Sequence, residues 1–141
     1  MKNYLNYKNY SKQNYANDYN KNYINTDLLF EPYQGFIRGN MFEKIYDPYK
    51  IKNPYDIRPM NEQADMLTYI DSLTFACIDL NLYLDVNPND KGMIELYNQY
   101  CSQKKQLINE YENKFGPLLL DSESLNTYPW AWNDQPWPWE N

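Results

Sequence analysis

Tyrosine supplies most of the reactive chemistry in this chain, with 16 copies among 141 residues. A peroxidase or another radical source can oxidise phenols, and two oxidised phenols couple to dityrosine. Six tyrosines fall within the first 25 residues and are candidates for such cross-linking: Tyr4, Tyr7, Tyr10, Tyr15, Tyr19 and Tyr23. The alternative is that these side chains serve only as amphipathic spacers.

The other side chains offer little for catalysis or metal binding. The sequence contains no histidine, so the commonest general base and most zinc and di-iron sites are missing. Asp71 and Asp79 lie eight positions apart, and oxygen ligands for a metal need a denser cluster. Gly35 and Gly39 match neither the Walker nor the dinucleotide-binding pattern. We therefore expect no catalytic residue, no metal site and no cofactor.

Charge and composition favour a structural or binding protein over an enzyme. Thirteen Lys and Arg against 19 Asp and Glu give a formal net charge of -6, which does not suit a general binder of nucleic acid or anionic membranes. The first 25 residues lack the apolar run of a signal peptide. The longest apolar stretch, residues 73–84, is too short to span a bilayer.

Two zones precede the two long helices that the sequence predicts. Residues 1–27, the arm, hold too few large aliphatic residues to offset the entropy of ordering. We expect a disordered arm, either a solvated tail or an adhesive, cross-linkable segment. Residues 28–59, the aromatic segment, are too few for a core of their own, and we interpret them as a docking segment. Its partner-binding candidates are Phe36, Phe42, Tyr46 and Tyr49.

One short helix is predicted within the aromatic segment. Asn40 and Glu43 form an N-x-x-E pattern, in which Asn caps the helix and Glu reaches back to it. This pattern predicts a helix from Met41 to about Tyr46, ended by Pro48.

A longer helix is predicted from Asn61, as N-cap, to about Leu84. Apolar residues recur along it at alternating spacings of four and three and form a heptad seam: Met66, Ile70, Leu73, Cys77, Leu80 and Leu84. Further apolar residues such as Ile78 widen the stripe, so we expect both sides of this helix to be covered.

A second long helix follows after a short turn. Asn87 at the N-cap, Pro88 at the first position and Asp90 at the third are residues that helix starts prefer. This helix should end at Phe115, with Gly116 in the left-handed conformation.

The short turn makes the two helices antiparallel neighbours and sets their register. Facing residue numbers should add up to about 173, so Cys101 would face Ser72, about five residues out of register with Cys77. We therefore expect two small buried apolar cysteines and no intramolecular disulfide. The lysines at 104 and 105 would lie near Asp71 as candidates for an interhelical ion pair.

Residues 116–141, the tail, contain all four tryptophans: Trp130, Trp132, Trp137 and Trp139. The prolines beside them favour an extended backbone. Because four exposed rings are costly, and a two-helix hairpin is too small to be stable alone, we expect the tail to pack on the hairpin, on the aromatic segment or on a partner. The alternative is a peptide- or carbohydrate-binding module that uses the tryptophan cluster.

Several of these motifs are similar to those of a known family. Residues from about 65 to 141 resemble the CotJB family of endospore coat proteins. The resemblance rests on LNLYLD (80–85), NPND (87–90), LYNQY (96–100), YExxFGPL (111–118), and the final PWAW and PWPW. A weaker likeness connects RGNMF (38–42) and YDPY (46–49) with the short CotJA coat proteins, so the chain resembles a fusion of the two.

The resemblance implies a non-enzymatic structural or adaptor protein, made in the mother-cell cytoplasm and deposited in the spore coat. It also implies assembly with other coat proteins, including a manganese-catalase-like partner, because members of this family are encoded and assembled with such a protein. Self-association into a homo-oligomer is left open. The predicted fold is mainly α, a two-helix hairpin within residues 60–141 with irregular flanking segments packed on it.

Overall fold

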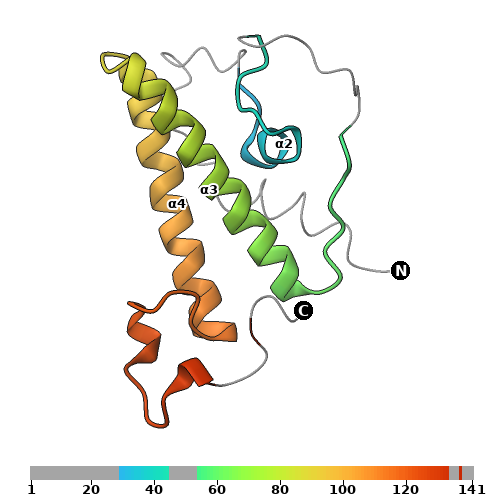
Figure 1. Ribbon diagram of the computed structural model, residues 1–141, viewed down its shortest axis with the longest axis vertical. Coiled ribbons are helices and arrows are strands. Elements are labelled where there is room, and N and C mark those ends of the chain that lie inside the picture. Colours follow the sequence, from blue (N-terminus) through green and yellow to red (C-terminus); the bar gives the residue numbers. More distant parts are fainter. Residues whose placement is uncertain (1–28, 45–53, 134–136, 138–141) are drawn as a thin grey trace.

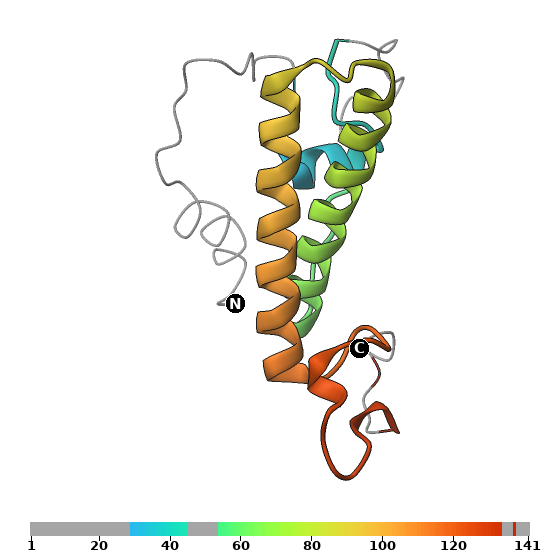
Figure 2. The same ribbon diagram turned by 90° about the vertical axis from the view of Figure 1, so that its left-hand side faces the viewer.

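The computed structural model describes residues 29–44, 54–133 and 137. Two long helices, α3 (Glu62–Val86) and α4 (Lys91–Phe115), lie side by side and antiparallel (Figure 1; Figure 2). The predicted mainly α fold, with a helical hairpin at its centre, is confirmed. None of the helices in the described ranges is both long and apolar enough to cross a membrane.

Shorter elements flank the hairpin. Helix α2 (Pro32–Arg38) packs against α3, and two single-turn 3-10 helices, η2 (Glu123–Leu125) and η3 (Ala131–Asn133), lie in the tail at the end of α4 (Figure 1). Pairing of extended backbone in the described part of the chain is limited to one bridge, between Leu29 and Phe42.

Helix α3 begins and packs as its sequence predicts. The Asn61 side chain caps the helix, with its Oδ1 2.8 Å from the Ala64 backbone nitrogen. Five of the six seam residues are buried, and Leu84, near the turn, is half-buried. The seam supplies α3's side of two hydrophobic clusters, one near the turn around Leu80 and one near the open end around Leu73.

The turn between the long helices differs from the prediction. Asn87 ends α3, because both its backbone N–H and its side-chain Nδ2 donate to the Tyr83 carbonyl at 3.0 Å. Asp90, and not Asn87, is the N-cap of α4, and its Oδ1 accepts from the Met93 N–H at 3.1 Å. The prediction of Asn87 as N-cap was wrong, because an Asn can close the preceding helix as well as open the next.

The end of α4 is also set differently. Phe115 is its last residue, as predicted, but Gly116 has φ 108° and ψ 174°. This conformation has the positive φ that favours glycine, but it is extended and not left-handed helical. The chain therefore leaves α4 directly into the tail and does not curl back over the last turn.

The register between the long helices is shifted from the predicted one. Cys77 and Cys101 were expected about five residues apart, yet their sulfur atoms lie 3.3 Å from each other. The reason is that side chains on a helix lean toward its N-terminus. In an antiparallel pair the two sets lean in opposite directions, so a residue of α3 meets a residue of α4 that lies farther from the turn.

The helix predicted from Met41 to about Tyr46 does not form in the described residues. Asn40 instead bonds locally to Phe42: its Oδ1 accepts from the Phe42 N–H at 2.8 Å and its Nδ2 donates to the Phe42 carbonyl at 2.6 Å. An Asn side chain can hold a turn in this way as readily as it caps a helix. Residues 45 and 46 lie outside the described ranges.

Helix α2 takes the place of the expected helix and lies upstream of it. Pro32 is its first residue, and Gly39 follows its end. Gly35 faces Met41, where an added Cβ would come within 2.3 Å of the Met41 Sδ. The absence of a side chain at Gly35 therefore lets the buried Met41 pack between α2 and α3.

Candidate interaction surfaces

The tail is held to α4 by one carboxylate that the sequence analysis did not identify. Glu112 Oε1 accepts from the Leu118 backbone N–H at 2.9 Å, and Glu112 Oε2 accepts from the Ser122 hydroxyl at 2.6 Å. Leu118 packs on the hydrophobic cluster at the open end of the hairpin, and Leu125 is buried. Hydrogen bonds and apolar contacts together fix the first part of the tail.

The tryptophans follow this anchored part and differ in exposure. Trp130 is 57% exposed, and the neighbouring Tyr128 is 98% exposed. Trp132 and Trp137 are half-buried and meet edge to face, with ring centroids 5.3 Å apart and an interplanar angle of 80°. This geometry suits the quadrupoles of two aromatic rings. Trp139 lies outside the described residues.

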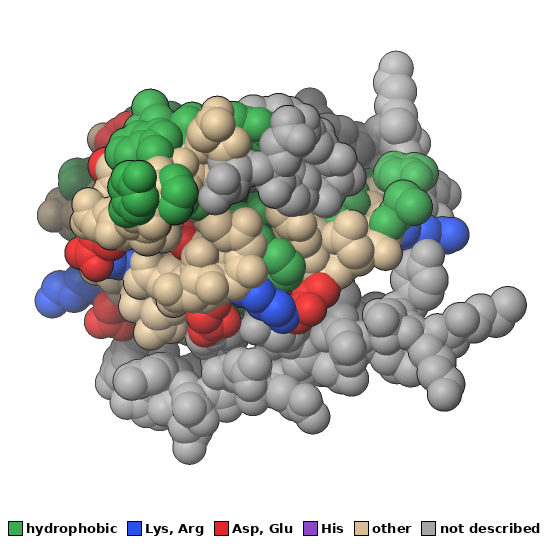
Figure 3. Space-filling view, turned by 90° about the horizontal axis from the view of Figure 1, so that it is seen from below, with side chains coloured by type: hydrophobic (Ala, Val, Ile, Leu, Met, Phe, Trp, Pro, Cys, Tyr) green, Lys and Arg blue, Asp and Glu red, His purple; other side chains and the backbone are tan. Residues whose placement is uncertain are grey.

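Several large apolar side chains of the tail stay exposed at the open end of the hairpin, and we call this set the tail surface. It consists of large apolar residues that are at least half exposed: Leu119, Leu120, Tyr128 and Trp130. Seen from this end of the molecule, apolar side chains form exposed patches, and charged side chains lie mostly along one edge of the described surface (Figure 3). Because the tail surface follows residues held by Glu112, a rigid helix supports it.

The two phenylalanine candidates of the aromatic segment pack against side chains of α3. Phe42 is buried and stacks on Tyr83, with ring centroids 5.0 Å apart. Phe36 is half-buried and meets Phe75 at 6.2 Å. The structure therefore places them apart from the tryptophans and in contact with the hairpin. Tyr46, Tyr49 and the six tyrosines of the arm lie outside the described residues.

A second apolar surface lies on α3 itself. Ile78, Leu82 and Val86 follow one another at four-residue intervals and are 57%, 59% and 78% exposed. Helices α4 and α2 both pack against α3, as expected, but Ile78, which was expected to widen the covered stripe, lies on a third side that they leave open. We call it the outer stripe. Asp71 and Asp85, which are also exposed, lie on the same helix.

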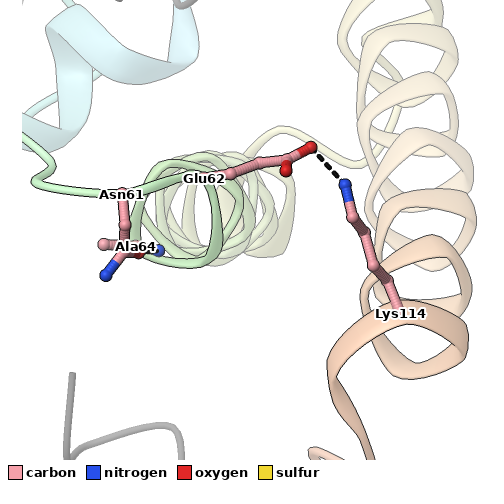
Figure 4. Close-up of polar contacts among 4 residues, drawn as sticks. All are labelled: Asn61, Glu62, Ala64 and Lys114. Atoms are coloured by element: carbon pink, nitrogen blue, oxygen red, sulfur yellow. Dashed lines mark hydrogen bonds and ion pairs between the residues drawn. The ribbon is translucent and has the colours of Figure 1, made fainter.

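The interhelical ion pair differs from the expected one. Glu62 at the start of α3 pairs with Lys114 at the end of α4 (Figure 4). In the described ranges, the lysines at 104 and 105 form no ion pair with Asp71. The shifted register explains the difference, because it moves the lysines away from Asp71 and brings the charge of Lys104 close to Cys77.

No metal site is assembled in the part of the chain that the structure describes. No group of three or more His, Cys, Asp or Glu residues there could hold a metal ion. What the described residues assemble is a small helical hairpin with two sets of exposed apolar residues, the tail surface and the outer stripe.

Comparison with known families identifies the hairpin and tail. A family model described as CotJB protein matches residues 64–140, more than half of the chain, so the chain belongs to the CotJB family of spore coat proteins. No curated protein and no solved structure matches it. The match covers nearly all of α3, all of α4 and the described tail, including Glu112 and Trp130. The aromatic segment precedes it, so its likeness to CotJA stays a prediction.

Proposed function

We propose that this protein is a non-catalytic structural adaptor of the endospore coat, synthesised in the mother-cell cytoplasm. The observation that carries the proposal is Trp130, a large aromatic residue that is 57% exposed on a tail anchored to α4. The matched family supports placement in the coat. An exposed, pre-positioned tryptophan is the kind of residue that dominates protein–protein contacts.

Anchoring of the tail favours binding because it lowers the conformational entropy that the tail loses when it docks. A free tail loses conformational entropy when it docks, whereas residues already held by Glu112 have lost much of it on folding. Tyr128 and Trp130 also keep their apolar surface available, because neither packs into the hairpin core. We therefore infer that the tail surface is the principal contact with a partner.

The partner that we propose is another coat protein, with a manganese-catalase-like protein as the specific candidate. The resemblance to CotJB proteins supports this choice, because such a protein is encoded and assembled with members of that family. The outer stripe supplies a second contact on a different face of the hairpin. Two separate contact surfaces on one small chain are what an adaptor between two coat components requires.

The arm gives the proposed adaptor a covalent function. Its six tyrosines are candidates for dityrosine formation, and the sequence around them is too polar to form a core. Cross-linking through the arm would fix a docked adaptor permanently in the coat.

Capture of partners from sporulating cells tests the proposal. The tagged full-length protein should recover coat proteins, including the catalase-like protein, and Trp130→Ala should lose them. Tyr55→Ala is the control, because Tyr55 is also an exposed aromatic residue, 83% exposed, but lies outside the tail. Equal recovery by Trp130→Ala and the native chain would contradict the role of the tail. Recovery of soluble glycans or peptides in place of coat proteins would favour a binding module.

A further inference from the structure

A pair of reduced cysteines faces across the hairpin. Cys77 lies on α3 and Cys101 on α4, both are free thiols, and the Cys101 Sγ donates a hydrogen bond to the Cys77 Sγ at 3.3 Å. An S–S bond is about 2.05 Å long, so bonding requires an approach of about 1.2 Å. Such a change is within the range of small side-chain and helix adjustments.

The two thiols differ in their access to solvent. Cys77 is 5% exposed and belongs to the buried seam, whereas Cys101 is half-buried. Burial, reinforced by the hydrogen bond with Cys101, raises the pKa of Cys77 to about 12. Cys77 is therefore protonated at neutral pH and shielded. Cys101 is the sulfur that an oxidant in solution reaches first.

A neighbouring side chain favours reaction at this pair. The positive charge of Lys104 acts on Cys77 in the direction that lowers its pKa, against the larger effect of burial, and so eases loss of the Cys77 proton when that sulfur reacts. The site thus combines an accessible thiol, a buried second thiol in contact with it and a nearby cation.

We propose that Cys77 and Cys101 are a peroxide-reactive pair that closes an intrachain disulfide between α3 and α4. The Cys101 thiolate attacks a peroxide oxygen, so that an S–O bond forms and the O–O bond breaks. With hydrogen peroxide, the departing hydroxide takes up a proton and leaves as water. The Cys77 sulfur then attacks the sulfur of the Cys101 sulfenic acid. The S–S bond forms, the S–O bond breaks, and the departing hydroxide takes the Cys77 proton as a second water.

The disulfide would tie the middle of the hairpin together. It joins residues 24 positions apart, and closing such a loop restricts the unfolded chain. The melting temperature should rise by roughly 10 °C on oxidation and return on reduction. The modification therefore gives this small hairpin a covalent tie in an oxidising environment.

The test treats the full-length reduced protein with hydrogen peroxide and follows it by intact mass and peptide mapping. The expected product is a monomer that has lost two hydrogens, with a peptide joining Cys77 to Cys101 that dithiothreitol separates. In Cys77→Ser, dimedone should trap the Cys101 sulfenic acid. In Cys101→Ser, Cys77 should stay unmodified for much longer. Cys77→Ala provides a second form of the first variant, and circular dichroism verifies that each variant is folded.

Other products would overturn the proposal. Disulfide-linked dimers, or sulfinic and sulfonic acids at Cys101 without an intrachain link, would show that Cys77 does not resolve the sulfenic acid. Equal dimedone labelling of Cys77 in folded Cys101→Ser would refute the order of attack. Unchanged thiols in the native chain, under conditions that oxidise a small-molecule thiol, would refute the reactivity itself.

Discussion

The Met41 backbone N–H donates a hydrogen bond to the Asp79 carboxylate, with its nitrogen 2.8 Å from Oδ2. Met41 is fully buried, and Asp79 lies in the middle of α3. This bond joins a part of the aromatic segment to the family-matched hairpin across 38 positions of sequence. In the sequence, Asp79 is too far from Asp71 to belong to a metal-binding cluster, and in the structure its carboxylate satisfies a buried amide.

Replacing Asp79 with Ala should therefore destabilise the packing of the aromatic segment. The Met41 N–H would lose its partner, and an unsatisfied buried donor costs about 1–3 kcal/mol. Chemical denaturation measures the change in unfolding free energy. Asp85→Ala, at an exposed carboxylate on the same helix, is the control and should change stability by less than about 0.5 kcal/mol. Equal effects of the two variants would contradict the role of the bond.

Replacing Leu80 with Asp should disrupt the hairpin core. Leu80 is fully buried in the cluster near the turn, and a charge placed there without a partner should cost several kcal/mol. Circular dichroism should show lost helicity or a much lower melting temperature. Leu82→Asp is the matched control, because Leu82 is 59% exposed two positions away. Native-like melting of Leu80→Asp would refute the seam.

Replacing Glu112 with Ala should release the tail and leave the hairpin intact. The Leu118 N–H and the Ser122 hydroxyl would both lose their acceptor, at a local cost of about 1–3 kcal/mol. Hydrogen exchange at residues 118–125 should become faster, and tryptophan emission should shift to longer wavelength. Glu95→Ala, at an exposed position on α4, should leave both measurements unchanged. Native protection at Leu118 in Glu112→Ala would exclude Glu112 as the anchor.

Replacing Asp65 with Asn should stabilise the protein at neutral pH. Burial, and secondarily the charge of Glu62, raises the pKa of Asp65 above its ordinary value of 3.8. Because the unfolded chain then ionises at lower pH than the folded one, stability falls as pH rises from 3.8 through the folded pKa. The variant should melt a few degrees higher at pH 7, and the difference should vanish below pH 3.8. A difference independent of pH would show that charge is not the cause.

Deleting residues 1–27 tests the proposed function of the arm. The shortened chain should keep the helicity and melting temperature of the native chain but enter the insoluble coat less well. Peroxidase with hydrogen peroxide should give dityrosine fluorescence chiefly from the intact chain, which retains Tyr4, Tyr7, Tyr10, Tyr15, Tyr19 and Tyr23. An equal dityrosine yield from the shortened chain would indicate a solvated tail.

The parts of the fold that sequence could predict are those that depend on local order. The seam of α3 and the Asn61 cap follow from spacing and from one side-chain bond three residues away. The turn was harder, because Asn87 and Asp90 both suit a helix start and only the packing of Tyr83 distinguishes them. The Tyr83 hydroxyl donates to Asp90 Oδ2 at 3.0 Å. The Tyr83 backbone carbonyl accepts a hydrogen bond from the Asn87 side-chain Nδ2.

The candidate surfaces depended on contacts that sequence spacing does not encode. The Cys77–Cys101 pair arises from the opposite lean of side chains on antiparallel helices, which a count from the turn ignores. The Glu112 anchor joins a helix to irregular backbone six to ten positions later. The sequence does contain a signal for α2, with Pro32 at its start and Gly39 after its end. The N-x-x-E pattern at Asn40 instead placed the predicted helix farther along the chain.

The order of synthesis gives the packing of Met41 on α3 a further consequence. Met41 leaves the ribosome before Asp79, and the 38 positions between them take about 2–8 s to translate. A helix forms within microseconds once its residues have left the ribosome. The interval before Met41 can pack on α3 is therefore determined by translation and not by folding. Met41 and Phe42, both buried in the finished fold, stay without their α3 surface throughout this interval. The nascent chain thus displays an apolar segment that chaperones or other coat proteins can bind before its own hairpin exists.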